Sequence, residues 1–222
     1  ALTDPQLLAL LATTREPTHV APSTVPAVAQ GESRSSTAQR ESANKSSKRL
    51  KESAIHRNPF WLLGATVRDD RRRIVALAEE RSLQKDPDAC QRARADLTNP
   101  RARLRAEMAW LPGLSPTKAT QYAERILEEP MSIRTATNLP VLARANLMGA
   151  AFEAIEAEDD PRDVAEFIQE LARLVDGISV EEVVRVINED RAVSGFPEIK
   201  ADDHIEAELV ERKLYFRNAV RE

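Results

Sequence analysis

Helix-start patterns recur through the second half of this 222-residue chain and restrict what it can fold into. Ser115-Pro116, Leu139-Pro140 and Asp160-Pro161 each precede a run of helix-forming residues, and proline suits the first turn of a helix. Ser179, with Glu182 three residues later, has the pattern of a capping box. Only six glycines are present, which disfavours a turn-rich β fold. The sequence therefore predicts an all-α protein.

Residues 112–222 are expected to form an acidic domain of successive amphipathic helices. The helices should begin near Ser115, Leu139, Asp160, Ser179 and Asp202 or Asp203. Paired antiparallel helices of this length pack as a helical bundle or a solenoid-like region. Their predicted apolar positions include Leu142, Leu147, Phe152, Ile155, Val164, Phe167, Ile168, Leu171, Leu174, Val175, Val183, Val184, Val186 and Ile187.

The last predicted helix carries an apolar stripe that continues almost to Glu222. Ile205, Leu209, Leu214 and Phe216 form the stripe, with Tyr215 beside it. Because no glycine or proline closes this helix, and because exposed apolar patches mark interfaces, the stripe predicts docking on a partner or a second copy. A chain that continues beyond residue 222 is the second possibility. A terminal helix packed against its own domain is the third.

The first 57 residues are predicted to be a disordered or linker segment. Residues 13–53 are rich in Ser, Thr, Ala and Pro and cannot bury enough apolar surface to offset the entropy lost on ordering. Charge divides the chain in the same way. Residues 1–57 carry eight Lys and Arg against five Asp and Glu, residues 58–111 eleven against eight, and residues 112–222 thirteen against twenty-three. The acidic third part argues against a nucleic-acid partner.

The sequence contains no pattern that indicates chemistry at a catalytic site. His19, His56 and His204 lack metal-ligand spacing, and no phosphate-binding glycine loop or nucleophile motif is present. We therefore expect no enzyme activity, no metal and no cofactor. Cys90 is the only cysteine, and no run of 18 apolar residues occurs, so a cytoplasmic protein with no membrane span is expected.

Residues 58–111 contain the most informative patterns. The segment opens with Asn58-Pro59-Phe60-Trp61-Leu62-Leu63-Gly64, and a basic helix is expected from about Asp69, with Ile74, Leu77, Ala78 and Leu83 apolar. Asp86-Pro87-Asp88 follows this helix. The segment closes with Ala93-Arg94-Ala95-Asp96-Leu97-Thr98-Asn99-Pro100-Arg101-Ala102-Arg103.

These motifs resemble the J-domain family of chaperone partners. Its members open with Asn-Pro-Tyr/Phe-x-x-Leu-Gly, carry His-Pro-Asp after a basic helix, and close with a motif similar to the one at residues 93–103. The resemblance implies a compact three-helix unit at residues 58–111, in which Phe60, Leu63, Ile74, Leu77, Leu97 and Leu104 share one core. It also implies a cochaperone or adaptor that binds a partner protein, a DnaK-type chaperone in the family.

The implied partner-binding residues are the basic cluster Arg71, Arg72 and Arg73 and the turn Asp86, Pro87 and Asp88. Asp86 stands where the family has the histidine that stimulates ATP hydrolysis, and the turn with the start of the next helix is about ten residues short. Stimulation is therefore expected to be weak or absent. The alternatives for the arginines are a solvated helix face or an RNA or DNA contact, against which no aromatic residues are interleaved with them. The alternative for residues 86–88 is an ordinary turn, in a structural or regulatory subunit of a complex.

Overall fold

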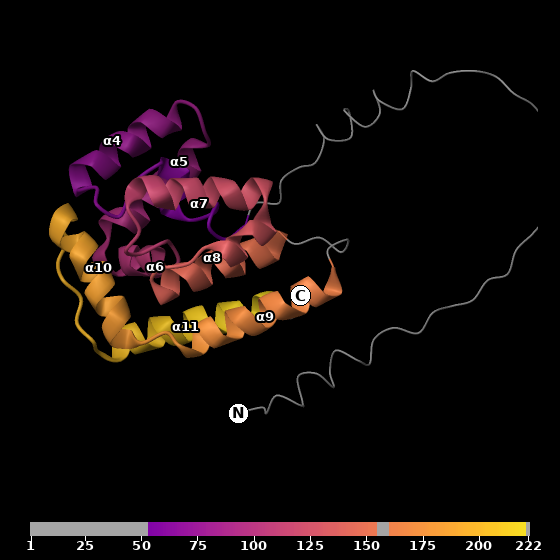
Figure 1. The fold of residues 1–222 in the computed structure, drawn as a ribbon. Coiled ribbons are helices and arrows are strands. Elements are labelled where there is room, and N and C mark those ends of the chain that lie inside the picture. The colour runs from indigo at the N-terminus through magenta and orange to yellow at the C-terminus, as the bar shows by residue number, and fades with distance from the viewer. Residues whose placement is uncertain (1–52, 155–159, 221–222) are drawn as a thin grey trace, which may run out of the picture. The chain divides into compact units, whose positions relative to one another are not determined.

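The computed structural model describes residues 53–154 and 160–220, and this part of the chain is all-α (Figure 1). The described residues contain no β-strand. The elements are α3 (Pro59–Leu63), α4 (Arg71–Ser82), α5 (Pro87–Thr98), α6 (Pro100–Met108), α7 (Pro116–Glu128), the short 3-10 helix η1 (Pro130–Thr135), α8 (Val141–Ala154), α9 (Pro161–Asp176), α10 (Val180–Ser194) and α11 (Asp203–Ala219).

A polar residue followed by proline starts several of these helices. The side-chain oxygens of Asn58, Asp86, Asn99 and Asp160 each accept a backbone N–H of the first turn, and a proline follows each of them. Proline loses nothing at this position, because its missing N–H would have no helical partner. The predicted start at Ser115 is confirmed as well, although its side chain makes no capping hydrogen bond.

Helices α6 and α8 lie in the interior. Nine residues of α8 are buried, including Asn146 and Gly149, so α8 is buried around most of its circumference rather than on one stripe. Helix α8 packs against α7, η1, α9 and α11, and α6 packs against α5 and α11. Phe216 of α11 lies where a side chain at Gly149 would project: a Cβ there would approach its Cδ1 to 3.0 Å. The glycine thus permits α11 to pack closely on α8.

One apolar core runs through both of the regions that the sequence separates at residue 111. Its buried members extend from Ile55 to Phe216. Ser53, Ile55 and His56 are buried, so the folded region already includes residues 53–57, which the sequence assigns to the linker. The predicted disorder of the preceding residues lies outside the described part of the chain. The boundary between a J-like unit and an acidic domain stays a prediction.

The segment predicted as three helices contains four, because Asn99 ends α5 and starts α6. The predicted shared core of this segment is confirmed, since all six residues are buried in one cluster. The prediction for Leu83 is wrong: its side chain is 87% exposed, because α4 ends at Ser82 and the chain turns away from the core. Glu182 also differs from a capping box, because its carboxylate accepts the N–H of Val141.

Helix α11 is largely covered by its own chain. Ile205, Leu209 and Phe216 are 1%, 5% and 2% exposed, so most of the predicted docking stripe is already occupied. Leu214 does not belong to the buried stripe, because it is 45% exposed, and Val210 one turn earlier is 63% exposed. These two are the large apolar side chains that α11 exposes, and docking of this helix on a partner or a second copy stays a prediction. None of the helices at residues 53–154 or 160–220 has the length and apolar content needed to cross a membrane.

Candidate partner-binding site

Helices α4 and α5 form a hairpin, which Figure 1 shows at one edge of the folded region. Only residues 83–86 connect the two helices, and so short a connection makes them antiparallel neighbours. The turn Asp86-Pro87-Asp88 lies at the tip of the hairpin, and all three residues are exposed. The structure therefore presents the predicted turn to solvent.

Asp86 starts α5. Its Oδ1 accepts the N–H of Asp88 at 3.0 Å, and Pro87 occupies the first turn. Its Oδ2 lies 3.9 Å from the guanidinium of Arg92, which is also exposed. One oxygen of this carboxylate therefore caps α5, and the other lies at the surface near the exposed Arg92.

The predicted basic cluster lies at the opposite end of α4. Arg71, Arg72 and Arg73 form its first turn, whereas the 86–88 turn follows its last residue. A helix of 12 residues spans about 18 Å, so the two sets of predicted site residues are not brought together. Arg71 and Arg73 also have different neighbours. Arg73 approaches Glu80 at 3.5 Å, and Arg71 lies 5.3 Å from the ring centre of Phe196.

The tip of the hairpin is acidic rather than basic. Glu79, Glu80, Asp86 and Asp88 are exposed there. Arg81 is turned inward, where its Nε donates to the carbonyl of Leu63 at 3.3 Å. Lys85 is thus the one basic residue at residues 79–88 that faces solvent fully.

A shallow hollow of about 610 Å³ lies beside the basic end, between α4 and the α5–α6 junction. We call it the arginine hollow. Its polar lining comes from Arg71, Arg94, Thr98 and Asn99, and its apolar lining includes Val75 and Pro100. Sequence reasoning missed Arg94 and Asn99, which stood in the closing motif without an assigned role. Only the packing of α4 on α5 brings them beside Arg71.

A buried ion cluster joins α6 to α10. The carboxylate of Glu107 accepts from Arg103 at 2.7 Å and from Arg191 at 2.9 Å, and all three side chains are at most 2% exposed. Arg103 also donates to the carbonyl of Val67 and stacks on the ring of Phe196, 3.7 Å from its centre. Burial lowers the pKa of Arg103, and the charge of Glu107 opposes that shift. The cluster thus links α6, and Val67 before α4, to α10.

Asp190 adds a second link between the same parts. Its Oδ1 accepts from Arg68 at 3.0 Å, and its Oδ2 accepts the N–H of Gly113 at 3.1 Å. A Cβ on Gly113 would lie 2.6 Å from Val186 and 2.9 Å from Pro140. The segment around Gly113 is therefore packed and hydrogen-bonded in place.

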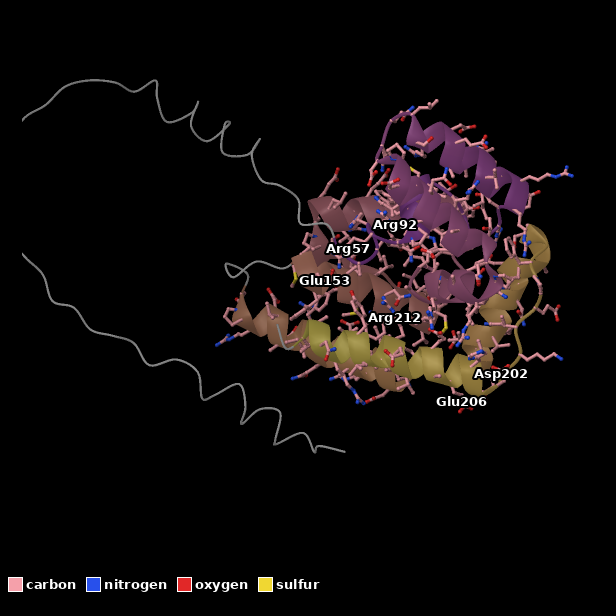
Figure 2. All side chains as sticks on the ribbon, turned by 180° about the vertical axis from the view of Figure 1, so that it is seen from behind. Arg57, Arg92, Glu153, Asp202, Glu206 and Arg212 are labelled. Carbon is pink, nitrogen blue, oxygen red and sulfur yellow. The ribbon has the colours of Figure 1, made fainter. Side chains whose placement is uncertain are left out.

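A second polar cluster lies where α11 crosses α8. Arg212 donates to Oδ1 of Asn146 at 2.7 Å, and Tyr215 donates to Oε1 of Glu153 at 2.7 Å (Figure 2 labels Arg212 and Glu153). Burial lowers the pKa of Arg212 to about 10. Burial, followed by the hydrogen bond to Glu153, raises the pKa of Tyr215. These hydrogen bonds hold α11 against α8.

Across residues 53–154 and 160–220, no three His, Cys, Asp or Glu side chains are grouped as metal ligands would be. Comparisons of the chain with protein-family models, curated protein sequences and solved structures give no significant match.

Proposed function

We propose that this chain is a J-domain-like adaptor, acting in the cytoplasm without catalysis of its own, and that it binds a partner protein through the α4–α5 hairpin. A DnaK-type chaperone is the first partner to test. The proposal rests chiefly on the exposed Asp86-Pro87-Asp88 turn at the hairpin tip, where the family carries His-Pro-Asp. Cys90, the single cysteine, is buried, which agrees with a reducing compartment.

The same turn explains why ATPase stimulation is expected to be weak. The carboxylate of Asp86 can only accept hydrogen bonds at neutral pH, whereas an imidazole can donate one. Glu79, Glu80 and Asp88 add exposed negative charge to the same part of the hairpin. This charge would weaken the contact of the tip with an acidic chaperone surface, and the unmodified chain is therefore expected to bind without strong stimulation.

The test measures binding and ATP hydrolysis of a purified DnaK-type chaperone with the full chain. The unmodified chain should bind and leave the hydrolysis rate within about twofold of its basal value. Asp86→His should increase the rate. Asp96→His is the matched control, because it makes the same chemical change at an exposed position on α5 away from the tip. Strong stimulation by the unmodified chain, or an equal gain with Asp96→His, would contradict the proposal.

A second candidate is a structural or regulatory subunit whose hairpin has no chaperone role. The buried cluster of Glu107, Arg103 and Arg191 favours it, because this cluster builds the hairpin side into one core with α10. Absence of chaperone binding by both the unmodified chain and Asp86→His would support this candidate.

A further inference from the structure

The arginine hollow presents hydrogen-bond donors that the protein itself does not use. Within residues 53–154 and 160–220, no carboxylate pairs with the guanidinium of Arg71 or Arg94. Asn99 directs its Oδ1 to the N–H groups of Arg101 and Ala102 at 3.0 and 3.1 Å. Its amide nitrogen, which can only donate, is thereby left without a protein acceptor in the described structure. Two guanidinium groups and one amide nitrogen, all of them hydrogen-bond donors, thus line one surface depression.

Neighbouring arginines behave differently. Arg68, Arg103 and Arg191 are each paired with an acid at 3.0 Å or less. The arginines at the α6–α10 junction are therefore paired with carboxylates, whereas the two in the hollow, like the exposed Arg72 and Arg101, have no ion pair in the described structure. Arg71 is nonetheless held in place, because its guanidinium lies over the ring of Phe196. A positioned guanidinium loses less entropy on binding an anion than a free one.

We propose that the arginine hollow binds a carboxylate side chain on an acidic segment of a partner protein. A guanidinium can bind a carboxylate through two parallel N–H donors, and α4 and α5 each bring one guanidinium, of Arg71 and Arg94, to the lining of the hollow. Val75, Ala95 and Pro100 supply an apolar lining for the aliphatic part of the same segment. The site lies at the end of the hairpin away from Asp86, so the inference rests on the proposed function in that the hairpin binds a partner protein, and it names the chemistry of a contact that does not involve Asp86.

The surroundings favour a peptide over a nucleic acid. A nucleic-acid surface needs a longer basic track and stacking aromatic rings. Here the acids Asp70 and Asp96 are exposed nearby on α4 and α5 and interrupt the basic surface. A polyanion must place successive phosphates against these acids, whereas an acidic segment needs to place only one carboxylate on the two guanidinium groups.

The experiment titrates a fluorescein-labelled hexapeptide of alternating Asp and Leu with the full chain and follows anisotropy. Arg71→Ala and Arg94→Ala should each weaken binding about fivefold or more. Arg72→Ala is the matched control: it removes the same charge from the same turn of α4 but does not line the hollow. It should change binding less than about twofold. Arg94→Lys, which keeps the charge but loses the paired donors, should give an intermediate loss.

The probes separate the chemistry of the ligand from its charge. A peptide of alternating Asn and Leu should bind at least about tenfold more weakly, and inorganic phosphate at 10 mM should not displace the Asp peptide. The proposal is overturned if the Asp peptide shows no saturable binding. It is overturned equally if Arg72→Ala weakens binding as much as Arg71→Ala, or if a DNA duplex displaces the peptide at a lower concentration than unlabelled peptide does. None of these readouts involves a chaperone, so this proposal and the proposed function fail independently.

Discussion

The α4–α5 hairpin and the α6–α10 junction use arginine and acid in opposite ways. In the hairpin, Arg73 and Glu80 lie 3.5 Å apart and are 51% and 62% exposed. At the junction, Arg191 and Glu107 lie 2.8 Å apart and are both 2% exposed. Exposed pairs contribute little to stability, whereas a buried pair cannot lose one member without leaving an uncompensated charge. The junction therefore fixes the fold, and the hairpin surface is free to serve binding.

The largest expected effect comes from breaking the junction. Glu107→Ala leaves the guanidinium groups of Arg103 and Arg191 buried without their shared carboxylate, and removal of one member of a buried pair costs about 3–5 kcal/mol. Urea denaturation of the full chain measures this loss. Glu80→Ala, which breaks the exposed pair, should change stability by less than about 1 kcal/mol. Similar losses in the two variants would refute the contrast between the regions.

Gly113 tests how tightly the junction is packed. Gly113 and Gly195 both have positive φ, 79° and 70°, so alanine is strained at either position by about 1–2 kcal/mol. At Gly113 the new Cβ also meets Val186 and Pro140, whereas at Gly195 nothing lies within 4 Å. Gly113→Ala should thus destabilise the protein by about 1–3 kcal/mol more than Gly195→Ala. Thermal unfolding of both variants gives this difference, and equal losses would show that residues 112–114 yield as a hinge does.

Asp86 should matter only to the hairpin. Asp86→Ala removes the N-cap of α5 and should cost about 1 kcal/mol. Because the cap lies far from the α6–α10 junction, amide exchange should speed up in α5 and stay unchanged in α6. Arg92→Ala, which removes only the exposed ion-pair partner of Asp86, should have almost no effect. Faster exchange throughout α6 would show that the two regions open together.

The smallest effect depends on pH. The raised pKa of Tyr215 means that the unfolded chain ionises this phenol first, from about pH 10 upward. The folded state therefore gains stability from Tyr215 below pH 10 and loses that gain as pH rises further. The free energy of unfolding of the unmodified chain should fall toward that of Tyr215→Phe between pH 9 and pH 11. The lowered pKa of Arg212 makes the free energy of unfolding rise with pH above about 10. This opposite trend is present in both the unmodified chain and Tyr215→Phe, so it does not affect their difference.

Glu153→Gln provides the check on that comparison. It replaces the carboxylate that accepts from Tyr215 with a neutral acceptor, so it should reduce the pH dependence without abolishing it. A gap between the unmodified chain and Tyr215→Phe that stays constant from pH 8 to pH 11 would contradict the assignment.

Local patterns predicted most of the helix starts, because a cap and a proline act on the backbone beside them. Asp160 and Asp202 cap α9 and α11 as expected. The error at Leu83 has a local cause too, because six residues after Leu77 is not a helical repeat and places Leu83 off the face of Ile74 and Leu77. In addition, α4 ends at Ser82, one residue before Leu83.

Long-range polar contacts were beyond the reach of the sequence. Glu107 and Arg191 are 84 residues apart, and each looks like an ordinary surface charge in its own helix. The candidate site divides in the same way. The 86–88 turn was visible as a local motif, whereas the arginine hollow exists only because Arg71 and Arg94 meet across two packed helices.

The contact between Phe216 and Gly149 has a consequence for synthesis on the ribosome. Helix α8 is made more than 60 residues before the phenylalanine that covers it. At about 5–20 residues per second, the interval is roughly 3 to 13 seconds. During that time the nascent chain carries the apolar helix α8, while α11, which covers it in the folded protein, has not yet been synthesised. A factor that shields α8 must therefore dissociate from it for α11 to pack.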